Sequence, residues 1–119
     1  MNQNPYIAGL ELVQKNYGTS GRAALAKGIL SLYNQVHPFS IGEILGPLSG
    51  EYTEVVLAMV SEYARHGETA ELRQAGEYVY ANFPGLIELS SAMSDARSKV
   101  RQEWQRQEEE EMRRLYPDD

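Results

Sequence analysis

Five consecutive residues at the start of a predicted helix are the best candidates for chemistry: Gly18, Thr19, Ser20, Gly21 and Arg22. The free backbone N–H groups and the dipole of a helix N-terminus favour a negative charge, and Arg22 can add a charge-assisted contact. This pattern predicts a site for a small phosphate or carboxylate, with an ordinary helix cap and two turn glycines as the alternative. The loop lacks the Lys-Ser/Thr pair and the glycine spacing of a Walker A motif.

The two histidines offer little further chemistry. His37 precedes Pro38 in a predicted turn, and His66 falls in the last turn of a predicted helix, where a positive charge favours the helix dipole. The chain has no His-Glu-x-x-His motif and no cysteine to complete a tetrahedral metal site. It also has no Gly-x-Ser-x-Gly nucleophile elbow. We therefore expect a structural or surface role for both histidines, with no catalytic residue, no metal and no cofactor.

Acidic side chains are numerous but evenly spread. Eleven basic and seventeen acidic residues give a net charge of −6. Residues 1–84 hold five basic and eight acidic side chains, and residues 85–119 hold six and nine. Neither part has the Lys/Arg density that phosphate neutralisation requires, which disfavours nucleic acid as a direct partner. Acid–base catalysis needs two carboxylates in one cleft, whereas most candidates fall on predicted solvent faces: Glu11, Glu43, Glu51, Glu54, Glu62 and Glu77.

Length and composition indicate one globular domain. The chain has 119 residues, of which 42% are hydrophobic, enough for a core without disulfides or metals. The N-terminal residues lack the pattern of a secretory signal, and no apolar run approaches the roughly 18–20 residues that span a bilayer. The absence of cysteine fits a reducing compartment. These observations predict a cytoplasmic protein without a membrane segment.

The elements that would position these residues are helices. Capping residues and helix-ending glycines or prolines delimit six helical segments, and no segment shows the alternation of a strand. The expected caps are Asn4, Thr19 or Ser20, Ser40 in a capping box with Glu43, Ser49 and Thr69. The expected stops are Gly18, Pro38, Gly46-Pro47, Gly67 and Pro84-Gly85.

The sequence thus predicts an all-α fold, a compact bundle of five or six helices arranged as two αα-hairpins, with a long charged C-terminal helix. Residues 1–103 would form the helical domain and residues 104–119 a charged helical extension. Apolar residues at helical spacing predict the buried stripes: Tyr6, Leu10, Val13, Tyr17; Leu25, Ile29, Leu32, Tyr33, Val36; Ile41, Ile44, Leu45; Tyr52, Val55, Val56, Met59, Val60, Tyr63; Leu72, Ala75, Val79 and Phe83.

Two groups of residues suggest a contact surface. Tyr78 and Tyr80 flank Val79, and a helix cannot bury all three on one narrow face, so one tyrosine belongs to a wide core or to a partner interface. In the C-terminal helix, apolar residues from Leu86 to Trp104 follow a near-heptad spacing. Glu108–Glu111 lie between arginines that can pair with them along one helix. That helix is either a solvated terminus or a docking element, whose predicted contacts are Val100, Trp104, Met112 and Leu115.

The second and third predicted helices carry a resemblance to a known family. Thr19, Ala26, Leu30 and Asn34, followed by Phe39, Ile41, Glu43 and Leu45, are the residues that carry it. This stretch resembles a family of small uncharacterised proteins of bacterial mobile genetic elements. The family has a Trp-Trp pair where this chain has Leu32 and Tyr33. The resemblance implies a bacterial, phage or plasmid origin and carries no reaction with it.

Taken together, the sequence predicts a non-enzymatic protein-interaction module that contacts another protein or a second copy of itself. One form of such a module is an acidic inhibitor, of the anti-defence or immunity type, that masks a basic surface. Two alternatives stay open at this point: a structural homo-oligomer assembled through the C-terminal helix, and a protein that binds a small anion or metabolite.

Overall fold

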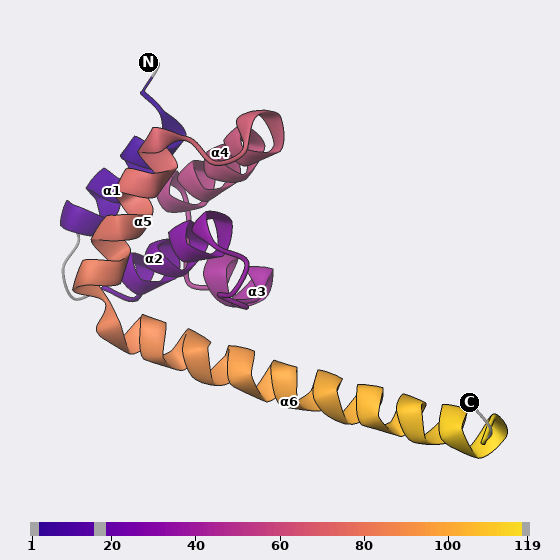
Figure 1. Cartoon of the computed structure of the whole chain (residues 1–119). Helices are drawn as coiled ribbons and strands as arrows, with labels where there is room; N and C mark the ends of the chain where they lie inside the picture. The colour runs from indigo at the N-terminus through magenta and orange to yellow at the C-terminus, as the bar shows by residue number, and fades with distance from the viewer. Residues whose placement is uncertain (1–2, 16–18, 118–119) are drawn as a thin grey trace.

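The computed structural model describes residues 3–15 and 19–117, and this part of the chain is built from helices alone (Figure 1). The helices are α1 (Pro5–Lys15), α2 (Ser20–Tyr33), α3 (Ile41–Leu45), α4 (Glu51–His66), α5 (Ala70–Asn82) and α6 (Pro84–Leu115). No strand occurs in the described residues. The predicted all-α bundle of five or six helices, with a long charged C-terminal helix, is therefore confirmed.

Most helix starts follow the predicted capping chemistry. The Asn4 side chain accepts a hydrogen bond from the Tyr6 amide at 2.8 Å, Thr19 accepts from Arg22 at 3.1 Å, and Thr69 accepts from Leu72 at 3.4 Å. Ser40 and Glu43 form the complete capping box. The start of α4 differs from prediction, because Gly50, at a φ of 56°, stands at the cap position with no side-chain cap, in place of Ser49.

The helix ends agree only in part with the predicted stops. Gly67 ends α4 at a φ of 67°, as expected for a glycine that takes a left-handed conformation. Helix α2 ends at Tyr33 with Asn34 as its cap, several residues before the predicted stop at Pro38, and Val36 consequently lies outside the helix and is half exposed. Helix α1 is described to Lys15, so the predicted stop at Gly18 and the buried position of Tyr17 lie outside the described residues.

Helices α1 and α2 occupy the centre of the body. Helix α4 packs on α1 and α2, α5 packs on the same two helices, and α3 covers α2. Because α4 and α5 pack across the first two helices and not along each other, the predicted arrangement as two αα-hairpins is corrected for the second pair. The fully buried side chains at the centre come from α1, α2, α4 and α5: Tyr6, Val13, Leu25, Ile29, Leu30, Met59, Leu72 and Val79.

Close helix contacts depend on two glycines. A Cβ atom at Gly76 of α5 would collide with the ring of Tyr33 from α2, and one at Gly9 of α1 would lie 2.8 Å from the Met59 sulfur of α4. Real Cβ atoms do not come this close to their neighbours. Gly76 therefore requires the smallest residue, whereas a larger residue at Gly9 would force the flexible end of the Met59 side chain to shift. The glycines therefore set how closely α5 approaches α2 and how closely α4 approaches α1.

In addition to Val36, three predicted core residues are exposed. Ile41 is 73% exposed, Val60 48% and Tyr63 37%. Residues 51–66 form the helix that the apolar spacing predicts, but the apolar stripe of α4 is wider than the surface that α1 and α2 cover. Part of that stripe therefore remains at the surface.

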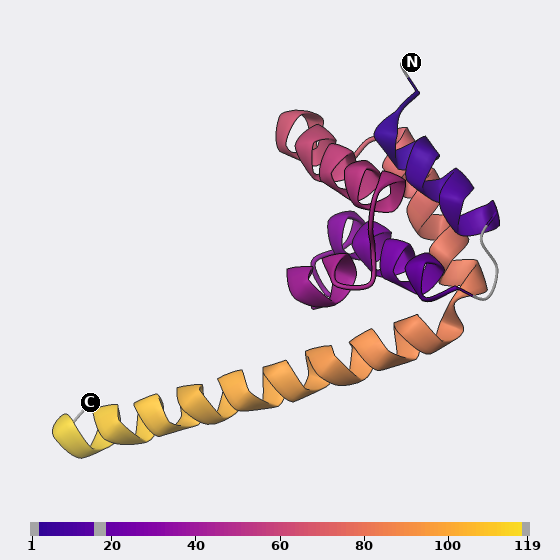
Figure 2. The same ribbon diagram turned by 180° about the vertical axis from the view of Figure 1, so that it is seen from behind.

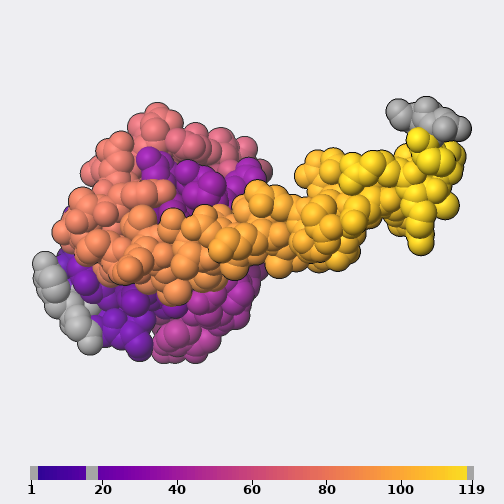
Figure 3. Space-filling view, turned by 60° about the horizontal axis from the view of Figure 1, so that its bottom comes forward, coloured from indigo at the N-terminus to yellow at the C-terminus, as the bar shows by residue number. Residues whose placement is uncertain are grey.

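Helix α6 leaves the body as a projecting arm. It begins beneath α5, crosses below α2 and α3, and continues well past them (Figures 1 and 2). The space-filling view shows its first turns against the body and its last turns standing clear (Figure 3). The whole chain measures 66 × 31 × 24 Å. Helix α6 runs through residues 103 and 104 without interruption, so no break in secondary structure marks the boundary that was predicted there.

Candidate functional site

His37, Ser90 and Tyr80 form a cluster of potentially reactive groups. The His37 ring lies 2.6 Å from the Ser90 hydroxyl through Nδ1, and 2.5 Å from the Tyr80 hydroxyl through Nε2. This serine–histidine pair could not be predicted from the sequence, because the two residues are separated by 53 positions. Ser90 is only 1% exposed and His37 5%. The pair therefore has no open face for a substrate, and the structure assigns it to packing.

One arrangement of protons satisfies the whole cluster. Burial raises the pKa of Tyr80, helped by the nearby Tyr33, so the phenol keeps its proton and can donate it to Nε2. Burial lowers the pKa of His37, which favours the neutral ring with its proton on Nδ1, donated to Ser90. The Ser90 hydroxyl in turn donates to the Ile87 carbonyl at 3.3 Å. The chain of donors ends on a backbone acceptor, so no buried proton is left without a partner.

This cluster fastens the start of α6 to the body. One turn after Ser90, the Ser94 hydroxyl donates to the Val36 carbonyl at 3.1 Å. The apolar side chains of Leu86, Ile87 and Met93 pack against the core beside these bonds. Ser90 and Ser94 are four residues apart and hence lie on one face of the helix. The segment between α2 and α3 is thus the surface on which the arm rests.

The predicted anion site is arranged as a structural cap. Thr19 caps α2, and Ser20 and Gly21 begin the helix. The Arg22 Nε donates to the Val13 carbonyl at 2.8 Å, and its guanidinium lies 4.4 Å from the centre of the Phe83 ring. Arg22 thereby links α1 and α2 to the junction of α5 and α6. Gly18 lies outside the described residues, and anion binding at this loop stays a prediction.

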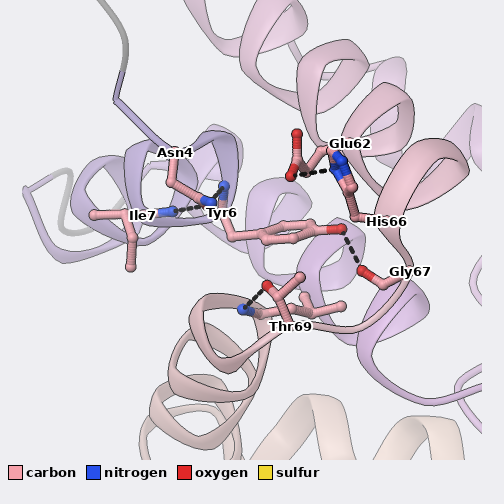
Figure 4. A network of polar contacts seen from close by, with 8 residues as sticks. Asn4, Tyr6, Ile7, Glu62, His66, Gly67 and Thr69 are labelled. Atoms are coloured by element: carbon pink, nitrogen blue, oxygen red, sulfur yellow. Dashed lines mark hydrogen bonds and ion pairs between the residues drawn. The ribbon is translucent and has the colours of Figure 1, made fainter.

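The second histidine, His66, lies at the end of α4, next to a hydrogen bond that joins α1 to the turn between α4 and α5 (Figure 4). The Tyr6 hydroxyl donates to the Gly67 carbonyl at 3.1 Å, and His66 pairs with Glu62 at 3.0 Å on the exposed side of α4. Burial raises the pKa of Tyr6, reinforced by Glu62. No group of three potential metal ligands occurs among the described residues. The arrangement explains how the end of α4 is held, without indicating chemistry.

An apolar groove lies between α2, α3 and α4. Its volume is about 300 Å³, and its walls are almost entirely hydrocarbon. The Lys27–Glu43 ion pair, at 3.3 Å, lies near one wall, with the ammonium 5.6 Å from the Phe39 ring. Three exposed residues of α3 and α4 line the groove: Ile41, Leu57 and Val60. Ile41 and Val60 are two of the residues for which the predicted core position is wrong.

The six predicted interface residues divide between the body and the arm. Tyr78 is half buried against the core, and Tyr80 is held by His37. Val100, Trp104, Met112 and Leu115 lie on the free part of α6, each about half exposed or more. Trp104, the only tryptophan of the chain, is 63% exposed.

Ion pairs among the described residues of the arm centre on Arg106 and, further along, join Glu111 to Arg114. Arg106 bonds Glu103 at 2.6 Å and Glu110 at 2.5 Å, and these residues lie on the face opposite Trp104 by the helical period. On the Trp104 face, Arg97, Arg101 and Glu108 have no hydrogen bond or ion pair with any described residue. The Trp104 face thus combines exposed apolar groups with charges, of which Arg97, Arg101 and Glu108 have no ion pair among the described residues and Glu111 lies 4.0 Å from Arg114.

Comparison with protein-family models, with curated proteins and with solved structures found no match. The family resemblance of residues 19–45 therefore stays a prediction. Within the described residues, no helix combines the length and the apolarity needed to cross a bilayer.

Proposed function

We propose that this chain is a non-enzymatic protein-interaction module that makes contact through the arm. The carrying observation is the free part of α6, which presents Val100, Trp104 and Leu115 to solvent. Large exposed apolar side chains that line one face of a long helix are typical of docking surfaces. Tryptophan is one of the residue types that are enriched at binding hot spots, which cluster near the centre of an interface.

The anchoring of α6 supports this proposal over that of a loose terminus. A charged terminal helix that makes no contact with a partner would need no buried hydrogen bonds to the body. Helix α6, in contrast, is bonded to the body at its start through His37–Ser90 and Ser94–Val36. The Arg106 ion pairs stabilise the helix locally beyond the body. The arm is therefore held in helical form at both its base and its middle, which lowers the entropy lost when a partner binds.

A narrower form of the proposal makes the protein an acidic inhibitor of the anti-defence or immunity type, from a bacterial mobile element. The net charge of −6 and the small size support it, because an acidic surface attracts and masks a basic one. Its partner would be a protein with a basic face. In this form, binding should weaken strongly as the salt concentration rises.

The test compares two single substitutions on the arm. Trp104→Ala removes the exposed ring, and Gln102→Ala, on the opposite face of α6, is the matched control. Tagged versions of the full chain are used to recover proteins, including untagged copies of the chain itself, from the native host. We expect Gln102→Ala to recover the same proteins as the unaltered chain and Trp104→Ala to lose them. Equal recovery by both variants, with helix content unchanged by circular dichroism, would refute the proposal.

A further inference from the structure

We infer that the partner of the arm is a second copy of this chain, bound antiparallel with the two Trp104 residues at the centre. The inference rests on the proposed function, since it assumes that the Trp104 face of α6 is the contact. The occupant and the direction of pairing follow from the charged residues on that face.

The charges around Trp104 are arranged in reverse order on its two sides. Arg97 and Arg101 precede it by seven and three residues, and Glu108 and Glu111 follow it by four and seven. These spacings are those of a heptad, so all four side chains lie on the Trp104 face of the helix. The half of the arm nearest the body is thus basic along this face, and the far half is acidic.

Such a face is complementary to itself only when two copies run in opposite directions. In an antiparallel pair centred on Trp104, Arg101 of each copy lies beside Glu108 of the other, and Arg97 lies beside Glu111. In a parallel pair, arginine would face arginine and glutamate would face glutamate, which is unfavourable. Because the dimer has two-fold symmetry, each of these arginine–glutamate pairs occurs twice.

The Trp104 side chains fit the same register, because the two rings meet at the centre. Leu115 of each copy comes level with Met93 of the other, whose side chain already packs against its own body, so the contact between the arms ends short of that residue. The overlap from Arg97 to Glu111 is on the order of 20 Å of helix. Such a contact is short, and it implies a dimer with a Kd roughly in the micromolar range.

Features of the monomer agree with this occupant. Arg97, Arg101 and Glu108 have no ion pair with any described residue and are available to pair between copies, whereas Glu111 already lies 4.0 Å from Arg114, at the limit of ion-pair distance. The arm extends clear of the body (Figure 3), so a second arm can lie alongside it.

The test uses charge reversals in the full chain, measured by sedimentation equilibrium. Arg101→Glu and Glu108→Arg each place like charges together in a homodimer, and each should weaken the dimer roughly 5- to 30-fold. An equimolar mixture of the two variants restores opposite charges and should regain the original affinity. Lys99→Glu and Glu109→Arg change the net charge equally on the opposite face, and should leave the dimer unchanged.

The outcomes separate this inference from the proposed function. A chain that stays monomeric up to about 1 mM overturns the inference, as does a dimer that none of the reversals weakens. If neither single reversal changes the dimer affinity, and the mixture of the two variants dimerises more tightly than the unaltered chain, the two helices pair in parallel and the inference is overturned. If the chain is monomeric while Trp104→Ala still loses a different protein from the native host, the inference fails and the proposed function stands.

Discussion

Replacing Ser90 by alanine tests whether the buried cluster holds α6 to the body. In the native chain the Ser90 hydroxyl accepts from His37 and donates to the Ile87 carbonyl. Alanine removes both bonds and leaves the Nδ1 proton of a 5%-exposed imidazole without its partner. The rest of the side chain is nearly unchanged in size, so the effect reports the hydrogen bonds and not the packing.

The expected loss follows from the burial of these groups. An unsatisfied buried polar group costs about 1–3 kcal/mol, and the better helix propensity of alanine returns about 0.5 kcal/mol. We therefore expect Ser90→Ala to lower the free energy of unfolding by about 1–2 kcal/mol. For a chain of this length that corresponds to a fall in Tm of roughly 4–8 °C.

The measurement is urea unfolding monitored by circular dichroism, with Ser91→Ala as the matched control. Ser91 precedes Ala92 on the same helix and is exposed, so its replacement should change stability by no more than about 0.5 kcal/mol, in the stabilising direction. If Ser90→Ala unfolds at the same urea concentration as Ser91→Ala, the hydrogen bonds of the cluster contribute nothing net, and the anchoring role assigned to them is wrong.

Three further predictions concern pH, packing and the arm. Burial holds the pKa of His37 below its ordinary value of 6.5, so the unfolded chain takes up a proton first as the pH falls. The free energy of unfolding should therefore keep the whole contribution of His37 above pH 6.5 and decrease as the pH falls below 6.5. In urea unfolding measured at each pH, the stability of His37→Gln should depend less on pH. Gly76→Ala should destabilise the fold by about 1–3 kcal/mol, because the added Cβ collides with Tyr33. Gly85→Ala, which has open space around it, should not destabilise the fold, and a comparison of the Tm values of the two variants tests this difference. Trp104→Ala should leave the Tm of dilute protein within about 2 °C, because the exposed ring stabilises nothing in the monomer, and a larger loss would mean that the arm folds back on the body.

The helices could be predicted because their signals are local. Capping by Thr19, Ser40 and Thr69 involves a side chain and a backbone amide three residues away, so the sequence contains both partners side by side. The start of α4 was misplaced for a related reason: Ser49 is a good cap by type, but the chain turns at Gly50, whose positive φ begins the helix there. Residue type alone does not reveal which of two adjacent residues takes the turn.

Packing could not be predicted, because it depends on which faces meet. The stripe of α4 predicts that Val56, Met59, Val60 and Tyr63 share one side, and only Val56 and Met59 of these are buried. Val60 borders a groove whose shape depends on where α3 lies relative to α2, and Tyr63 lies one turn beyond it at the surface. The same limit applies to His37, whose partners come from α5 and α6. No spacing rule connects residues that the fold brings together across 43 and 53 positions.

The anchor and the proposed contact are linked through the geometry of one helix. Ser90 and Ser94 face the body, and Trp104, ten residues beyond Ser94, lies about 15 Å further along the axis and within a quarter turn of that face. A continuous helix transmits the orientation of its base to its middle, so the two bonds at the base determine which way Trp104 points relative to the body. Ser90→Ala should consequently alter how two bodies are oriented in the dimer while leaving the charge pairs around Trp104 intact. A small-angle scattering profile that changes at unchanged dimer affinity would show this separation of roles, and a loss of affinity equal to that of Arg101→Glu would refute it.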